Sequence, residues 1–111
     1  MVTASDLKRS GRPRRRATAH VRATQPLCHL CGLPIDLTLD RHRHPLGSTI
    51  DEVIPVHHGG STTDPNNLRH AHRCCNTSRG TKPITPEVRA RCQHLAHTAM
   101  TTNQPPEPSP W

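Results

Sequence analysis

Aromatic residues are almost absent from this 111-residue chain, which contains no Phe, no Tyr and a single Trp, Trp111. The chain also lacks any run of about 20 apolar residues, the length that a helix needs to cross a bilayer. No N-terminal stretch has the apolar run of a secretory signal peptide. We therefore expect one small domain that is not in a membrane and whose apolar core is too small to hold the fold alone.

A small domain that lacks apolar residues usually contains disulfides or a metal ion as a staple. The chain has five cysteines, an odd number, and without a secretory signal a disulfide framework is disfavoured. The cysteine content therefore favours a metal site and a location in the reducing cytoplasm.

Positive charge is concentrated near the N-terminus. Residues 1–24 carry seven basic residues and one acidic residue, whereas the rest of the chain carries eight and seven. We expect residues 1–24 to form a disordered arm that binds the phosphates of a nucleic acid. Within this arm, Gly11-Arg12-Pro13 is similar to the core of an AT-hook, although a nonspecific basic tail is the simpler interpretation. The predicted contacts are Arg12, Arg14, Arg15 and Arg16.

Residues 25–102 have the patterning of a folded domain, and the four prolines within 103–111 predict a disordered tail. Glycines, prolines and β-branched residues divide the domain into short segments. The expected elements are a turn at 28–32, a strand within 48–56, a loop at 57–66, a second strand at 67–71 and a helix that ends by Gly80.

A last helix is expected from Thr85 to about Met100. Thr85 is suited to the N-cap, Pro86 to the first helical position and Glu87 to the first turn. The predicted apolar stripe of this helix consists of Val88, Cys92, Leu95 and Met100.

Two spaced pairs of residues have the pattern of a structural zinc site. Cys28 and Cys31 lie on a turn that Gly32 closes, so that both thiolates can bind one tetrahedral ion. His72 and Cys75 have the same spacing and share one face at the start of a helix. His70 and Cys74 form an alternative second pair, but the matching spacing favours His72 and Cys75. We expect a closed Cys₃His site, because four protein ligands leave no position for a substrate.

Five ordered segments within residues 28–82 carry a resemblance to a known family. They are Ile50-Asp51-Glu52-Val53-Ile54-Pro55, Gly59-Gly60, Asn67-Leu68-Arg69, His72-Arg73-Cys74-Cys75-Asn76 and Arg79-Gly80. This order resembles the HNH endonucleases, in particular a zinc-containing phage and actinobacterial type with Asp-Glu in place of Asp-His. The resemblance implies a small α+β fold with a ββα-metal (His-Me finger) core, a structural Cys₃His zinc site and disordered termini.

The resemblance also implies roles for the matching residues. Asp51 and Asn76 would bind a catalytic Mg²⁺ or Mn²⁺ ion, and Asn67 would orient the hairpin that carries the catalytic group. Arg79 or Lys82 would contact the backbone of double-stranded DNA. The implied reaction is hydrolysis of a phosphodiester bond, in which a metal ion stabilises the developing negative charge.

Glu52 occupies the position of the family's general-base histidine, and three alternatives follow. Glu52 itself accepts the proton, which we favour. Alternatively, Glu52 joins Asp51 at the metal ion and His57 or His58 is the base. In the third case, the site is inactive and the chain only binds DNA.

Other functions remain open at this stage. A noncatalytic zinc-finger DNA-binding protein explains the basic arm and the Cys₃His site equally well, but it does not require Asp51, Asn67 and Asn76. The resemblance further implies an association with phage terminase and DNA packaging, in the cytoplasm of a bacterial host. An adaptor protein for such a complex is the third hypothesis.

Overall fold

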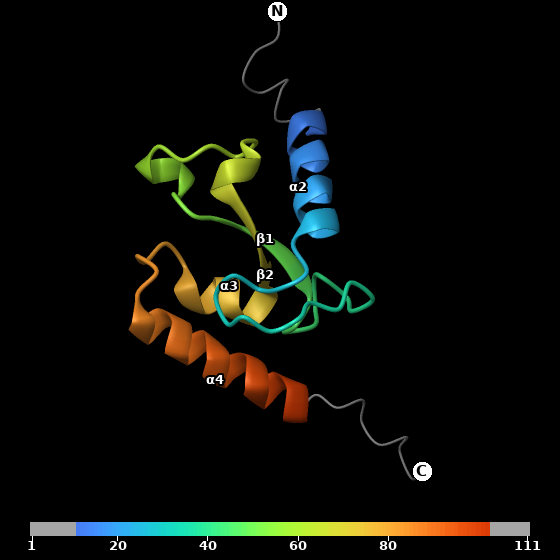
Figure 1. Ribbon diagram of the computed structural model, residues 1–111, viewed down its shortest axis with the longest axis vertical. Helices are drawn as coiled ribbons and strands as arrows, with labels where there is room; N and C mark the ends of the chain where they lie inside the picture. Colours follow the sequence, from blue (N-terminus) through green and yellow to red (C-terminus); the bar gives the residue numbers. More distant parts are fainter. Residues whose placement is uncertain (1–10, 103–111) are drawn as a thin grey trace, which may run out of the picture.

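The computed structural model describes residues 11–102, and its centre is a two-stranded antiparallel hairpin (Figure 1). Strands β1 (Ser48–Glu52) and β2 (Leu68–His72) pair in the register that places Asp51 opposite Arg69. Helix α3 (Arg73–Arg79) follows β2 directly. The hairpin and α3 together form the ββα unit, and the predicted small α+β fold is confirmed.

The long connection between the strands contains two short 3₁₀ turns, Val56–His58 and Pro65–Asn67. A Cβ atom on Gly60 would collide with the backbone carbonyl of Ile54, so only glycine lets the loop pass this close to the end of β1. The predicted boundaries of the strands agree with the structure to within a few residues, because turn residues mark them in the sequence.

Helix α4 (Pro86–Thr102) packs beneath α3 (Figure 1). Its predicted N-cap is confirmed, since Thr85 Oγ1 accepts a hydrogen bond of 3.2 Å from the Val88 amide. The predicted apolar stripe is partly wrong, because Leu95 is only half-buried and small residues provide much of the contact. The fully buried residues of α4 are Cys92, Ala96 and Ala99.

The N-terminal segment differs from our expectation. Residues 12–24 form helix α2 (Arg12–Thr24) and not a disordered arm or an extended AT-hook. Ala17 and Val21, four residues apart, are both buried on one face of this helix. Residues 1–10 and 103–111, where we also predicted disorder, lie outside the described residues.

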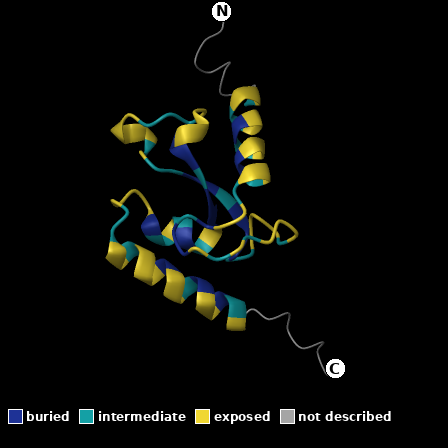
Figure 2. Ribbon diagram, in the orientation of Figure 1, coloured by how far each residue is buried: buried dark blue, intermediate teal, exposed yellow. Residues whose placement is uncertain are grey.

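Two small apolar clusters lie on opposite sides of the hairpin (Figure 2). In the first, Ile50 and Leu68 of the hairpin pack against α2. The second joins the turn at 28–31, Ala71 of β2, α3 and α4. The hairpin therefore contributes residues to both clusters and connects α2 with α3 and α4. None of the described helices is both long and apolar enough to span a membrane.

Candidate metal centre and active site

Cys28, Cys31, His72 and Cys75 converge as predicted. Their ligand atoms lie within 4.8 Å of one another, and all four residues are buried. Cys28 and Cys31 come from a turn in which the Gly32 amide donates to the Cys28 carbonyl, and Gly32 has a φ of 81° that favours glycine. His72 ends β2 and Cys75 lies in α3.

The cluster has the surroundings of a metal site. His72 Nδ1 lies 3.2 Å from Cys31 Sγ, while its other ring nitrogen donates to the Pro34 carbonyl at 3.0 Å. Such a second hydrogen bond fixes the orientation of a metal-binding imidazole. The His72 amide also donates to Cys28 Sγ at 3.4 Å. The four residues therefore could hold a metal ion.

The charges within the cluster support the same conclusion. Burial lowers the pKa of His72, but hydrogen bonds with Cys28 and Cys31 outweigh burial and raise the pKa to about 10. Hydrogen bonds with Cys31 and Cys75 hold the pKa of Cys28 well below its ordinary value, while those with Cys28 and Cys31 raise the pKa of Cys75. A divalent cation bound by these donors would displace their protons.

The alternative ligands are engaged elsewhere. The ring of His70 lies between the Ser48 hydroxyl, at 2.7 Å, and the Gln25 carbonyl, at 2.6 Å. Burial lowers the pKa of His70. Cys92 packs in the apolar cluster, as predicted, and the half-buried Cys74 packs against the same cluster.

The Asp51 carboxylate is buried and lies next to two basic side chains, those of Arg79 and His29. Arg79 Nη1 donates to its Oδ1 at 3.0 Å and to its Oδ2 at 3.1 Å. His29 Nε2 lies 2.8 Å from Oδ2, within hydrogen-bonding distance. Only 5% of the Asp51 side chain is exposed. A carboxylate charge that is buried to this extent needs hydrogen-bonding partners such as Arg79 and His29.

Glu52 lies next to Asp51, but its side chain leaves the hairpin on the opposite face, because side chains alternate along a strand. Its carboxylate is 3.5 Å from Arg14 Nη1 of α2, and Arg14 also donates to the Thr62 carbonyl at 2.8 Å. The N-terminal helix therefore brings an arginine to the predicted catalytic glutamate.

Asp51, Glu52 and Asn76 nevertheless line one small pocket of about 140 Å³ at the junction of β1 and α3. The pocket also contains Arg79 and the turn that follows it. The remaining lining residues are Ile50, Pro55, Gly80 and Thr81. Carboxylate and amide oxygens at one opening are suitable ligands for a hard divalent cation.

Asn67 does not reach this pocket. Its Oδ1 accepts from the Ile54 amide at 2.8 Å, and its Nδ2 donates to the carbonyls of Ile54 and Ser61 at 3.0 and 2.9 Å. These bonds close the loop between the strands.

Arg79 and Lys82, the two predicted DNA contacts near the site, have different environments. Arg79 is 2% exposed and also donates to the carbonyls of Glu52, Val53 and Lys82. This burial does not favour the predicted contact of Arg79 with DNA. Lys82 is exposed.

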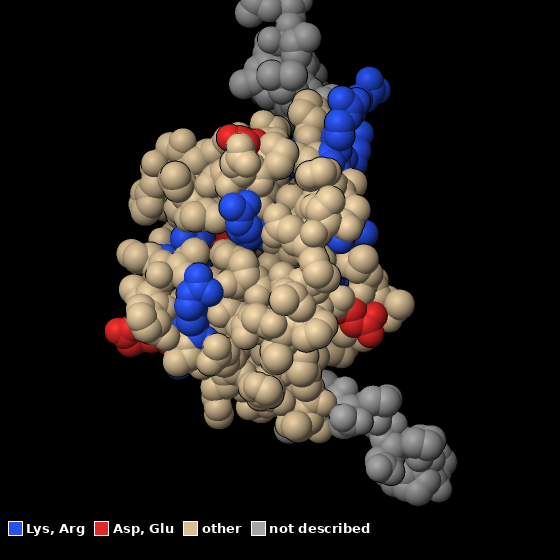
Figure 3. Space-filling view, viewed as in Figure 1, with Lys and Arg blue, Asp and Glu red and all other residues tan. Residues whose placement is uncertain are grey.

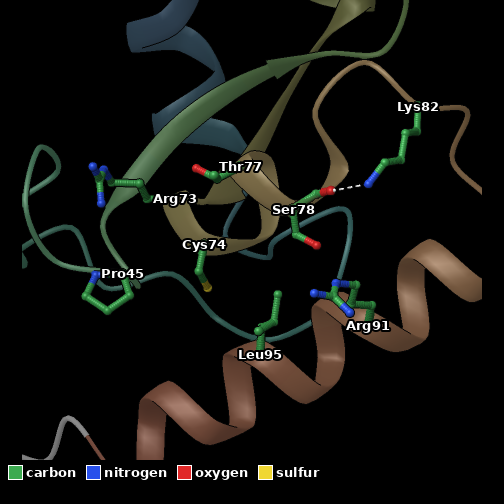
Figure 4. A pocket seen from close by; sticks show the side chains of 8 residues that line it. All are labelled: Pro45, Arg73, Cys74, Thr77, Ser78, Lys82, Arg91 and Leu95. Carbon is green, nitrogen blue, oxygen red and sulfur yellow. Dashed lines mark hydrogen bonds between the residues drawn. The ribbon is translucent and has the colours of Figure 1, made fainter.

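Lys82 lines a second, larger groove of about 540 Å³ between α3 and α4 (Figure 4). The groove also contains Arg73 and Arg91, and its other lining residues are Pro45, Cys74, Thr77, Ser78 and Leu95. Lys82 Nζ donates to the Ser78 carbonyl at 3.1 Å. Basic side chains from three segments therefore surround this groove.

Sequence reasoning did not identify His29 and Arg14 as partners of Asp51 and Glu52. No local pattern connects them, because His29 is 22 residues from Asp51 and Arg14 is 38 residues from Glu52. The only signal was the presence of a histidine between the two cysteines of the turn.

Comparison with known proteins agrees with this geometry. Residues 28–82, about half of the chain, match the family model for HNH endonuclease, and this range contains both metal-ligand pairs and all residues of the small pocket. No curated protein and no solved structure matches the chain significantly. From the family match, the ββα unit and the Cys₃His cluster, we conclude that the chain belongs to the HNH endonuclease family.

Proposed function

We propose that the protein is a metal-dependent DNA endonuclease that hydrolyses phosphodiester bonds at the pocket of Asp51, Glu52 and Asn76. The observation that carries this proposal is that these three residues, which occupy the motif positions, line one pocket at the junction of β1 and α3. The family match supports a nuclease.

Two metal ions belong to this proposal. The Cys₃His cluster would hold Zn²⁺, because thiolates and an imidazole in a closed set of four suit this ion. Asp51 and Asn76 would hold Mg²⁺ or Mn²⁺ through their oxygen atoms. When bound there, the second ion would stabilise negative charge on the phosphate and acidify a water molecule.

Glu52 is the proposed general base. Its carboxylate pairs with Arg14. A DNA phosphate would compete for Arg14, which is 42% exposed, and would leave the carboxylate free to accept a proton from water. Arg79 would keep Asp51 in place, since it holds both oxygens of this carboxylate.

The basic surface of α2 is the proposed contact to the DNA backbone. Arg12, Arg15 and Arg16 are exposed on this helix, and basic side chains gather over it in Figure 3. Lys82, which lines the groove between α3 and α4, would add a further contact. Because each phosphate contact releases counterions, binding should weaken steeply with salt.

Cleavage of supercoiled plasmid tests the catalytic assignment. With Mg²⁺ or Mn²⁺ the protein should produce nicked or linear DNA, and Asp51→Asn should abolish this activity. Glu52→Gln should lower the rate about 100-fold or more, the usual contribution of a general base. Glu87→Gln, an exposed glutamate of α4, is the matched control. Equal cleavage by the wild type and Asp51→Asn would exclude the proposed site.

A noncatalytic DNA-binding protein is the second candidate, and one observation favours it. Arg79 already neutralises the Asp51 carboxylate, which weakens the attraction of this residue for a metal ion. This candidate predicts salt-dependent DNA binding without cleavage by the wild type. An association with phage terminase, and a location in the cytoplasm of a bacterial host, are further proposals that rest on the resemblance alone.

A further inference from the structure

The motif positions that hold histidines in the family contain no imidazole in this chain. Glu52 and Asn76 occupy them, and none of the residues that line the small pocket is a histidine. If the motif residues were the only protein ligands of the proposed catalytic ion, the ion would therefore be bound by oxygen atoms alone.

An imidazole nevertheless reaches the pocket carboxylate from another part of the chain. His29 Nε2 lies 2.8 Å from Asp51 Oδ2. The His29 side chain is 14% exposed, so it is largely shielded from water but still accessible. This nitrogen lies closer to the carboxylate than either contact from Arg79.

The turn at 28–31 holds His29 firmly in this position. The His29 amide donates to the His70 carbonyl at 2.9 Å, and Arg89 of α4 donates to the His29 carbonyl at 2.7 Å. Cys28 and Cys31, on either side, belong to the Cys₃His cluster. The turn thus directs two thiolates toward one site and the imidazole between them toward another.

We propose that His29 is a ligand of the catalytic divalent cation, next to Asp51, and supplies the imidazole that the motif positions lack. This inference rests on the proposed function. In an octahedral shell with bonds of about 2.1 Å, neighbouring ligand atoms lie about 3 Å apart, close to the observed separation of 2.8 Å. The ion would take the place of the hydrogen bond between the two atoms, whose separation already suits adjacent ligands of one ion.

An imidazole ligand has a consequence for metal preference. First-row transition metal ions, Mn²⁺ included, accept an imidazole nitrogen more readily than Mg²⁺ does, whereas oxygen ligands alone suit Mg²⁺. The site should therefore bind Mn²⁺ more tightly than Mg²⁺, and His29 should be the cause of the difference.

Electron paramagnetic resonance of Mn²⁺ bound to the zinc-loaded, full-length protein tests the proposal. Electron spin echo modulation by a directly bound ¹⁴N nucleus is expected in the wild type and should be lost in His29→Gln. The dissociation constant for Mn²⁺ should rise about 10-fold or more in this variant, the scale on which even the indirect partners of metal ligands act. Affinity for Mg²⁺ should change less. His97→Gln, an exposed histidine of α4, is the matched control and should behave like the wild type.

Absence of nitrogen modulation in the wild type would overturn the proposal, and this result does not depend on the folding of any variant. Unchanged Mn²⁺ affinity in a zinc-loaded His29→Gln protein would also overturn it. Plasmid cleavage is measured separately. Cleavage without nitrogen coordination would exclude His29 as a ligand and leave the proposed nuclease function in place. Nitrogen-coordinated Mn²⁺ without cleavage would support His29 as a ligand and exclude the proposed nuclease function.

Discussion

Buried polar side chains connect the segments of this domain by hydrogen bonds, where other small domains use packed aromatic residues. Arg79 and Asn67 are both at most 9% exposed, and each connects several backbone carbonyls or amides. Among the described residues, no buried side-chain nitrogen or oxygen lacks a hydrogen-bond partner. Because an unpaired polar group in the interior is costly, removal of one such side chain affects every group that it joins.

Asn67→Ala should lower the free energy of unfolding by about 2 kcal/mol or more, because the Ile54 and Ser61 backbone groups would lose their partner. Urea unfolding of the purified protein measures this change. Asn66→Ala is the control, since Asn66 is exposed and should be almost neutral. Equal stability of the two variants would show that Asn67 does not close the loop.

Helix α2 is an element whose stability comes from tertiary contacts. Its sequence is dominated by arginine, and only Ala17 and Val21 are buried. Arg22 Nε donates to the Ser48 hydroxyl at 2.9 Å, which gives the helix a polar attachment to β1 as well. An isolated helix of 13 residues would be marginal in water, so docking on the hairpin explains why the helix forms.

Val21→Ala should destabilise the docked helix by about 2 kcal/mol, because it removes buried methyl groups and leaves a cavity. Hydrogen exchange of the α2 amides should become faster, while exchange in α4 stays almost unchanged. Val56→Ala provides a matched comparison at a valine that is 51% exposed. Unchanged protection of α2 in Val21→Ala would contradict the proposed docking.

At the scale of the whole molecule, the Cys₃His cluster joins segments that are distant in the sequence. The cluster links the turn at 28–31 to the end of β2 and to α3. Cys28, Cys31 and Cys75 also belong to the larger apolar cluster. Zinc binding to a structural site contributes roughly 10–16 kcal/mol, while the net stability of a domain is only about 5–15 kcal/mol. The fold should therefore depend on the ion.

Removal of the metal by a chelator should unfold the domain, with loss of helical circular dichroism, and added Zn²⁺ should restore it. Elemental analysis should find one zinc ion per chain. Cys75→Ser should lose the ion and the fold, whereas Cys74→Ser, a change at the neighbouring half-buried cysteine, should keep both. A zinc-free protein with unchanged structure would exclude a structural metal site.

The ligand set, the hairpin, the helix after it and the capped last helix could be predicted from the sequence, because each depends on local spacing. Two cysteines around a turn, or a histidine and a cysteine three positions apart, are brought together by the geometry of a few residues. Thr85 marks the start of α4 for the same local reason.

Only the tertiary structure decided which groups surround the pocket and how the N-terminal segment folds. Arg79 and His29 meet Asp51 across 28 and 22 residues of chain, and Arg14 meets Glu52 only after α2 has docked. Such contacts depend on the packing of whole elements, which composition and spacing do not encode. The arginine-rich segment therefore appeared unstructured in the sequence, and it forms a helix because the hairpin offers two apolar residues, Ile50 and Leu68, for it to cover.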